Sequence, residues 1–188
     1  MSLYINPDIS KASTLPAEFY LESQYFDLCK KNIFSRSWQL VADTTRLIQH
    51  NIFPVTFLEH LINEPLVLIK NQNEIKCFSN VCSHRAHLVS TEPCQSKKLK
   101  CMYHGRTFNL DGTIYSMPGF KDVHNFPTEK DNLEAIPIKI WKQFILVSLN
   151  AGIDIFPALN DIQTRLSGFP FHDLIYDEDN SQSWEIDA

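Results

Sequence analysis

The sequence predicts a mainly β protein, an antiparallel β sandwich or barrel, with a helix before it. Three observations support this fold class. The middle of the chain is a series of short β-rich runs, turn residues separate these runs at close spacing, and helical periodicity is confined to the two ends. The chain has 188 residues, of which 44% are hydrophobic and 21% are charged, so it is long enough to bury a core.

The first expected element is a helix from about Glu22 to Phe34. Leu21, Tyr25, Cys29 and Ile33 are spaced four residues apart and would share one face of that helix. Such a face is typical of a helix that packs against another element, so the sequence predicts a partner surface for it.

Nine short strands are expected after this helix. Asn71-Gln72-Asn73 joins two of them as a hairpin turn would, and Asp111-Gly112 is the strongest hairpin signal in the chain. The expected strands are 38–42, 52–57, 66–70, 74–78, 99–102, 107–109, 113–115, 136–141 and 144–149.

The pattern changes again after Asn150. The spacing of apolar residues predicts a helix over 155–166, which Gly168 and Pro170 would end. The acidic run 177–180 predicts a solvated turn, and 184–187 resembles the start of a further strand.

Composition argues against several classes of protein. The net charge is −5 with a pI near 5.8, and the absence of a basic stripe argues against a nucleic-acid partner. The longest apolar runs, such as Phe144–Leu149, are too short to cross a bilayer, and the N-terminus does not have a signal-peptide pattern. Five cysteines, an odd number in a chain of this length, predict reduced thiols and a cytoplasmic protein.

Two motifs carry the chemistry: Cys82-Ser83-His84 and Cys101-Met102-Tyr103-His104, with sixteen residues between His84 and Cys101. Each motif offers one thiolate and one imidazole. This is the ligand set of a Rieske centre, in which two cysteines bind one iron of a [2Fe-2S] cluster and two histidines bind the other. We expect each pair on its own loop, with the cysteines pointing inward and the histidine-bound iron near the surface.

A structural zinc site is the alternative, because two cysteines and two histidines also complete a tetrahedral zinc shell. Zinc fingers usually pair like ligands with like. The alternating Cys-His, Cys-His order on β-rich sequence therefore favours the cluster. His87 lies close to His84, and we interpret it as a polar loop residue and not as a ligand.

The residues around these motifs resemble the Rieske domain of ring-hydroxylating oxygenase large (alpha) subunits, in the choline-monooxygenase-like group. The resemblance covers about residues 20–188. It implies a Rieske domain over 38–150, an N-terminal helical segment over 1–37 that packs on a catalytic domain, and the truncated start of that α+β catalytic domain over 151–188. The matching residues are Asn80–Arg85, Cys101–Gly105, Thr107-Phe108 and Asp111-Gly112.

Two positions depart from the family pattern: Ala86 replaces a glycine, which would tighten the first loop, and Arg106 replaces a tryptophan. We expect Arg106 to alter either the surroundings of the cluster or a docking surface. The respiratory Rieske proteins place two hydroxyl groups near the cluster where this chain has Arg106 and Phe108. Hydrogen bonds to sulfur raise the reduction potential, so their loss predicts a low potential, on the order of −150 mV.

The resemblance implies a function in electron transfer within an oxidoreductase. The cluster would accept single electrons from a reductase or ferredoxin and pass them to a mononuclear non-haem Fe(II) that activates O₂. That iron requires two histidines and a carboxylate, which this chain does not offer in one stretch, so the oxygen-activating site would lie in the missing catalytic domain. In the family a neighbouring subunit, usually of a homotrimer, receives the electron. A stand-alone Rieske ferredoxin is the alternative, but it needs neither the N-terminal helix nor the segment after Asn150.

Overall fold

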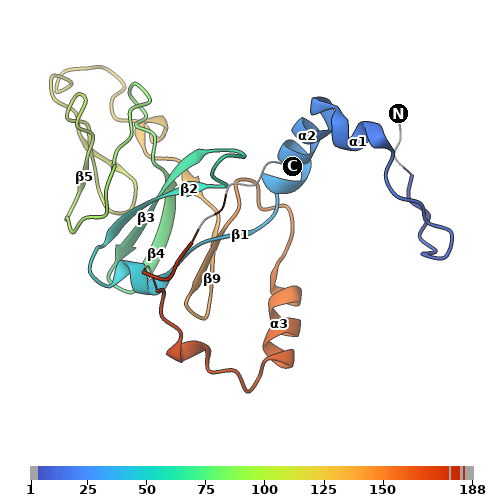
Figure 1. Cartoon of the computed structure of the whole chain (residues 1–188). Coiled ribbons are helices and arrows are strands. Elements are labelled where there is room, and N and C mark those ends of the chain that lie inside the picture. Colours follow the sequence, from blue (N-terminus) through green and yellow to red (C-terminus); the bar gives the residue numbers. More distant parts are fainter. Residues whose placement is uncertain (1–3, 178, 183, 185–188) are drawn as a thin grey trace.

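The computed structural model describes residues 4–177, 179–182 and 184, and within these residues the fold is an antiparallel β structure with short helices at both ends (Figure 1). Three small sheets form its body. In spatial order, the first sheet contains β1 (Gln39–Asp43), β10 (Phe144–Val147) and β9 (Ile138–Trp141). The second contains β2 (Ile52–Phe57), β3 (Glu64–Asn71), β4 (Glu74–Ser79) and β8 (Ala135–Ile136). The third contains β5 (Leu99–Lys100), β6 (Thr107–Phe108) and β7 (Ile114–Ser116).

The predicted mainly β fold is confirmed, with one difference in how the strands are divided. The run 136–141, expected as one strand, forms β8 and β9, which belong to different sheets. Pro137 separates them. A proline has no backbone N–H for a strand ladder and its φ is restricted, so the chain leaves one sheet there and enters the other.

Both expected hairpin turns are present. The β3–β4 hairpin pairs Asn71 with Glu74 across a two-residue loop, in which Gln72 has a φ of +55°. At Asp111-Gly112, the amide of Asn109 donates to the carbonyl of Thr113, which brings β6 back into β7.

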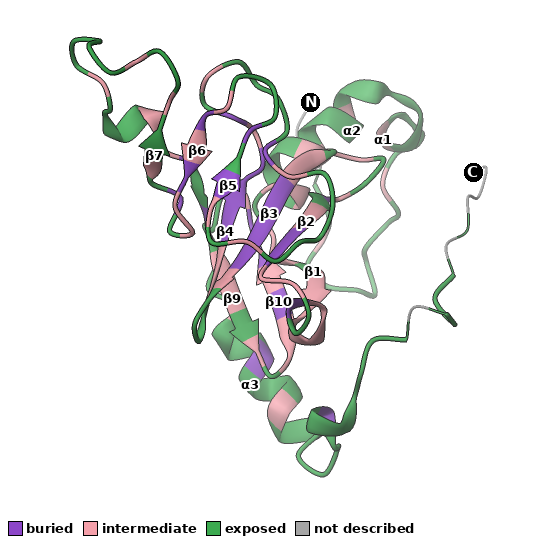
Figure 2. Ribbon diagram, turned by 90° about the vertical axis from the view of Figure 1, so that its left-hand side faces the viewer, coloured by how far each residue is buried: buried purple, intermediate pink, exposed green. Residues whose placement is uncertain are grey.

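Two hydrophobic clusters fill the body, and the buried residues follow the central strands (Figure 2). One cluster lies between the first two sheets and includes Phe57, Leu68 and Val147. The other connects the second sheet to the third sheet and includes Phe78 and Phe108. The second cluster also contains the two motif cysteines, so the core of the fold extends up to the candidate site.

The N-terminal helical segment extends away from the β body (Figure 1). It consists of α1 (Ala17–Leu21), α2 (Ser23–Cys29) and a π-helical turn, Lys30–Phe34. The predicted helix is therefore present. Its expected apolar face, however, is not buried within the described residues: Leu21 is 82% exposed and Ile33 is 56% exposed.

At the other end, α3 (Phe156–Arg165) forms within the predicted range 155–166. In the acidic run the backbone N–H of Asn180 donates to Asp177 Oδ1. Glu178 and the strand expected at 184–187, apart from Trp184, lie outside the described residues. None of the helices in the described part of the chain has the length and hydrophobicity that a bilayer crossing requires. The described residues also form three 3₁₀ turns: Thr44–Leu47, Glu129–Asp131 and Phe171–Asp173.

Candidate metal centre

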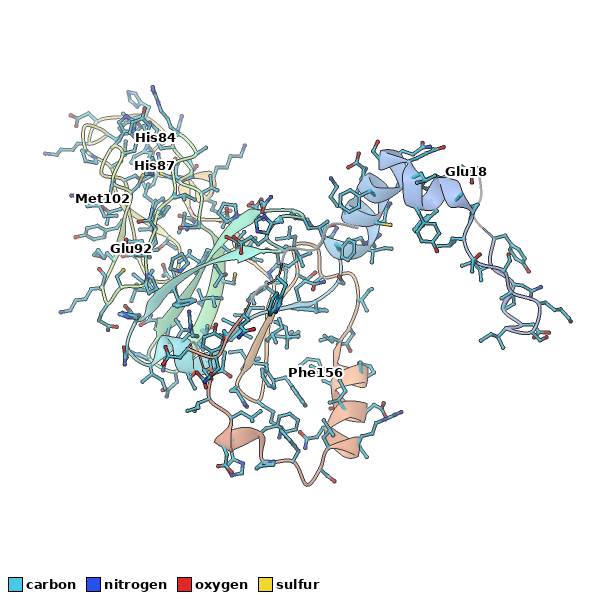
Figure 3. The ribbon with its side chains drawn as sticks, in the orientation of Figure 1. Glu18, His84, His87, Glu92, Met102 and Phe156 are labelled. Carbon is cyan, nitrogen blue, oxygen red and sulfur yellow. The ribbon has the colours of Figure 1, made fainter. Side chains whose placement is uncertain are left out.

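The two motifs lie on neighbouring loops at one end of the β body. The first loop follows β4, and the second connects β5 to β6. In Figure 3, His84, His87 and Met102 lie together at this end, far from Glu18 of α1 and Phe156 of α3. The structure therefore brings together the four side chains that the sequence predicts as ligands.

The two loops have the same backbone hydrogen-bond pattern. In the first loop, the amide of Cys82 donates to the carbonyl of His87, at 2.8 Å, and the amide of Ala86 donates to the carbonyl of Cys82, at 3.0 Å. In the second loop, the equivalent bonds run from Cys101 to Arg106, at 2.8 Å, and from Gly105 to Cys101, at 2.9 Å. Each cysteine is thus held at the start of a tight turn whose tip carries the histidine.

Both turns need a residue with positive φ four positions after the cysteine. Gly105 has a φ of +77° and Ala86 a φ of +52°. A left-handed conformation costs a residue with a Cβ about 1–2 kcal/mol, which glycine avoids. Ala86 therefore replaces the usual glycine without changing the shape of the first turn, but at a cost in stability.

Burial separates the sulfur donors from the nitrogen donors. Cys82 and Cys101 are only 3% and 2% exposed, and Cys101 lies near enough to Cys82 to contribute, after burial, to the raised pKa of that thiol. His104 is exposed and His84 is half-buried, and their ring centroids are 4.9 Å apart at an interplanar angle of 76°. The site thus presents a thiol pair on the inside and an imidazole pair on the outside.

The surroundings shift the pKa values of the Cys82 thiol and the His84 imidazole in opposite directions. Burial raises the pKa of Cys82, so the thiolate needs a bound cation to be stable there. Desolvation and the positive neighbours His104, Arg106 and Arg85 lower the pKa of His84. A lowered pKa keeps the His84 imidazole neutral, which is the form that binds a metal.

The arrangement in two pairs matches the ligand set of a two-iron cluster. A structural zinc site brings four ligands to one point. Among the described residues, no three His, Cys, Asp or Glu side chains converge on one ion position. In a Rieske centre each iron takes only two protein ligands, so the two pairs fit the cluster.

Aromatic side chains cover the imidazole pair. The Tyr103 ring lies 3.9 Å from the His104 ring, and Phe120 meets the edge of the His84 ring at 6.1 Å. His87 packs beside Tyr103 at 5.5 Å, and its Nδ1 is 2.7 Å from the carbonyl oxygen of Leu88. His87 is thus engaged by its own loop, as expected of a polar loop residue.

A polar network around one buried arginine, which the sequence did not reveal, lies beside the ligand loops. Arg106 is 3% exposed, and its Nη1 donates to Ser83 Oγ at 2.8 Å while its Nη2 is 3.3 Å from Asp131 Oδ1. Ser83 Oγ donates to the carbonyl of Asp131 at 2.6 Å, and the guanidinium lies 5.5 Å from the centre of the Phe126 ring. Arg106 departs from the family pattern in the sequence, but no feature of the sequence predicts its ion pair with Asp131.

This network also contains a buried hydrogen-bond donor that has no acceptor among the described residues. The Nε–H of Arg106 is buried and has no hydrogen-bond partner among the described residues. A buried donor without a partner costs about 1–3 kcal/mol. Sulfur atoms of a bound cluster are acceptors of the kind that this donor lacks, so the donor set fits the group that the motifs imply.

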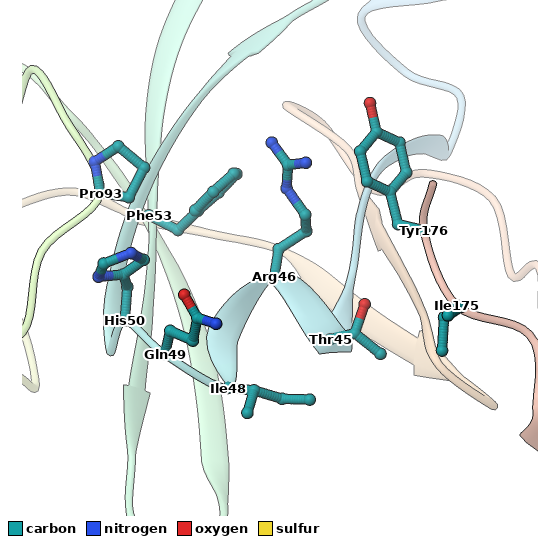
Figure 4. A pocket seen from close by; sticks show the side chains of 9 residues that line it. All are labelled: Thr45, Arg46, Ile48, Gln49, His50, Phe53, Pro93, Ile175 and Tyr176. Carbon is teal, nitrogen blue, oxygen red and sulfur yellow. The ribbon is translucent and has the colours of Figure 1, made fainter. Parts of the chain in front are cut away.

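A separate pocket of about 460 Å³ lies between the 3₁₀ turn after β1 and the C-terminal segment (Figure 4). The Arg46 guanidinium lies 5.0 Å from the centre of the Phe53 ring and 4.4 Å from that of Tyr176. His50 is the only imidazole among the described lining residues, and none of these is a carboxylate. The pocket therefore does not offer the two histidines and one carboxylate of a mononuclear iron site.

Comparison with known proteins agrees with this geometry. The Rieske [2Fe-2S] domain family matches residues 37–127. The carnitine monooxygenase oxygenase subunit of Escherichia coli K12 is 30% identical over 160 residues, which are 84% of this chain and 40% of that protein. The chloroplastic choline monooxygenase of Arabidopsis thaliana is 26% identical over 145 residues, covering 77% of this chain and 34% of that protein.

A solved structure of a quaternary ammonium Rieske monooxygenase, described in connection with carnitine oxidation and inter-subunit electron transfer, superposes with a TM-score of 0.74. It is 26% identical, and the match covers 89% of this chain and 47% of that one. The chain spans about 40% of the length of the carnitine monooxygenase oxygenase subunits that it matches. Residues 37–127 therefore form a Rieske [2Fe-2S] domain, and the proteins that the chain resembles are oxygenase subunits of Rieske oxygenases.

Proposed function

We propose that this chain is the electron-input part of a Rieske non-haem iron oxygenase. In this proposal Cys82 and Cys101 bind the inner iron of the [2Fe-2S] cluster, and His84 and His104 bind the outer iron. The observation that carries the proposal is the separation of two buried, neighbouring thiols from two adjacent imidazoles that are more exposed. When bound, the cluster supplies storage and transfer of one electron.

The protein's own residues would control access to the imidazole pair. Tyr103 and Phe120 lie against the two histidine rings and keep water from part of their surface. Met102 and Tyr103 are exposed beside His104 and form an apolar surface at the outer edge. We infer that a reductase or ferredoxin docks at this edge, since electron donors of this class must approach the cluster closely.

The electron would leave for a mononuclear Fe(II) in a catalytic domain that activates O₂. We propose that residues 1–37 and 151–188 contact that domain and that 38–150 is the Rieske unit. Exposed apolar side chains on the N-terminal helices, Tyr20, Leu21, Phe26 and Leu28, support a covering partner for this segment. By analogy with the inter-subunit electron transfer described for the solved relative, the receiving iron would belong to a neighbouring subunit. We expect the assembly to be a homotrimer and to be cytoplasmic.

The ligand assignment is tested by metal content and spectroscopy. After anaerobic reconstitution we expect two irons and two acid-labile sulfides per chain, a red-brown colour, and reduction by one electron. Zinc, or one iron without sulfide, would contradict the proposal.

A pair of histidine variants sharpens this test. His104→Ala should lose the cluster or its Rieske spectrum, because one iron would lack a protein ligand. His87→Ala is the matched control, since His87 lies at the same surface and its Nδ1 contacts the carbonyl oxygen of Leu88 in its own loop. Equal cluster content and equal spectra in both variants would overturn the assignment of His104.

A further inference from the structure

Arg106 is a charged side chain buried at the point where the two ligand loops meet. Its backbone carbonyl accepts from the amide of Cys101, so it belongs to the second loop. Its guanidinium reaches Ser83, which lies between Cys82 and His84 in the first loop. Through Asp131 it also holds the segment that carries Phe126. One side chain therefore connects three segments that are far apart in the sequence.

The negative charge of Asp131 does not fully offset the positive charge of Arg106 at the ligand loops. The guanidinium is 3% exposed, whereas the Asp131 side chain is 21% exposed, so the cation is the more deeply buried member of the pair. Solvent screens the carboxylate more than it screens the guanidinium. The positive end of the pair also makes the contact with Ser83, beside Cys82. The net field at the ligand loops is therefore positive.

A positive field affects the two oxidation states of the cluster differently. Two ferric ions, two sulfides and two thiolates sum to about zero charge in the oxidised state. One electron from an external reductase converts one ferric ion to ferrous, and no bond forms or breaks. The reduced site carries one more negative charge, which a buried cation stabilises.

We propose that Arg106 is a positioning residue that fixes the two ligand loops against each other and raises the reduction potential of the cluster. This inference rests on the proposed function, because it requires a cluster on Cys82, His84, Cys101 and His104. The low potential expected from the missing hydroxyl groups would thus be partly offset.

The test compares substitutions at the two ends of the ion pair in the cluster-loaded chain. Arg106→Met removes the cation and leaves the carboxylate, so the midpoint potential should fall. Asp131→Asn leaves the cation without its counter-charge, so the midpoint potential should rise. We expect the equilibrium constant for one-electron reduction to fall at least tenfold in the Arg106→Met variant. This fall corresponds to a midpoint potential lower by about 59 mV. Visible and EPR spectra check that the ligand set is unchanged.

Opposite shifts are the signature of electrostatic control. Shifts of the same sign in the two variants, or no shift in either, would overturn the inference. If Arg106→Met does not bind the cluster, Asp131→Asn alone decides the sign, because Arg106 is retained in it. Arg106→Lys should recover part of the lost potential, and a potential as low as that of Arg106→Met would exclude charge as the cause.

Arg85→Met is the matched control for a cation near the cluster. Arg85 lies next to His84 but is exposed, so its charge is screened by solvent. We expect a smaller shift than for Arg106→Met, and an equal shift would refute a special role for the buried cation. A wild-type chain that binds no [2Fe-2S] cluster would defeat the proposed function itself. A loaded wild type with unshifted variants would defeat only this inference.

Discussion

Burial decides what each cysteine of this chain can do. Cys82 and Cys101 are buried, but they lie at the start of the ligand loops, where a cluster can reach them. Cys77 is buried in the core between the sheets, and burial raises its pKa to about 12. Cys94 is exposed. The thiolate is the reactive form, so a raised pKa and a covered position both protect Cys77.

Alkylation of the cluster-loaded protein should therefore be selective. We expect iodoacetamide at mildly alkaline pH to modify Cys94 rapidly and to leave Cys77 unmodified until the protein is denatured. Peptide mass spectrometry measures both sites in one sample. A Cys94→Ser variant should keep its visible spectrum, since that thiol is not a proposed ligand. Modification of Cys77 at the same rate as Cys94 in the folded protein would contradict its placement in the core.

Asp111 links the stability of the β6–β7 hairpin to pH. Its Oδ1 accepts from the backbone N–H of Thr113 at 2.9 Å and from Thr113 Oγ1 at 2.6 Å. These bonds to the Thr113 side chain and backbone lower the pKa of Asp111 below its ordinary value. A carboxyl whose pKa is depressed by folding stabilises the protein above its unfolded pKa, and this contribution is lost as pH falls through the folded pKa.

Asp111→Ala should therefore destabilise the protein most near neutral pH. The difference in unfolding free energy from wild type should shrink as the pH is lowered below about 4. Urea unfolding of both proteins at several pH values measures this difference. Thr113→Val, which removes the hydroxyl donor, should reduce the same pH dependence. A difference that grows toward acid would have the wrong sign for a lowered pKa.

At the scale of single residues, the sequence predicts the ligands but not their surroundings. The Cys-x-His and Cys-x-x-His motifs are local, so their residue types and spacing carry the information. The partners of Arg106 are not local: Asp131 is separated from Ser83 by 48 residues and meets it only after the loops have folded. No pattern along the chain marks such a contact before the structure is known.

At the scale of elements, Gly112 shows why one hairpin turn tolerates no side chain. Gly112 is buried with a φ of +85°, and a Cβ added there would lie 2.8 Å from Cδ1 and Cζ of the Phe78 ring. Phe78 belongs to β4 and to the core cluster below the ligand loops. The turn is therefore packed against the second sheet as well as being left-handed.

Gly112→Ala should consequently cost more than strain alone. Gly119 is the matched control, because its φ is +77° but nothing lies within 4 Å of its Cβ position. We expect Gly119→Ala to lose about 1–2 kcal/mol from left-handed strain. Gly112→Ala should lose a further 1–3 kcal/mol from overpacking against Phe78. Equal losses, measured by chemical denaturation, would show that the Phe78 contact is unimportant.

The strands themselves were largely predictable, whereas their partners were not. Alternating apolar residues and turn signals locate β2, β3 and β4 to within two residues, because the pattern and the hairpin are both local. By contrast, β1 pairs with β10, so that Gln39 lies opposite Val147. The break at Pro137 also assigns β8 and β9 to different sheets, a choice that depends on this long-range pairing.

At the scale of the whole molecule, the core and the flanking segments are separate. Every residue of the two buried clusters, and every apolar residue packed against them, lies between positions 41 and 149. All four proposed ligands lie in the same range. The N-terminal helices contribute no buried residue to either cluster among the described residues. The C-terminal segment contacts the body through Phe171, which lies outside both clusters and packs against Trp141 and Phe144.

This separation predicts that a polypeptide of residues 35–151 will fold and keep its cluster. It retains both core clusters, both ligand loops and the hydrogen bond from the Asn150 amide to the Ser35 carbonyl. Its midpoint potential should match that of the full chain, because Arg106 and Asp131 are also retained. Its stability should be lower, since removing Phe171 uncovers Trp141 and Phe144 at a cost of about 1.5–3 kcal/mol.

The variant Phe171→Ala in the full chain is the control for that loss. It should show part of the destabilisation of the 35–151 polypeptide, because Ile153, Phe156 and Tyr176 of the C-terminal segment also contact the body. Thermal unfolding and iron content of the three proteins measure the comparison. A 35–151 polypeptide that folds but cannot hold iron would mean that a flanking segment helps to form the site. That result would contradict the proposed division at residues 37 and 150, because the two ligand loops should need only the β body beneath them.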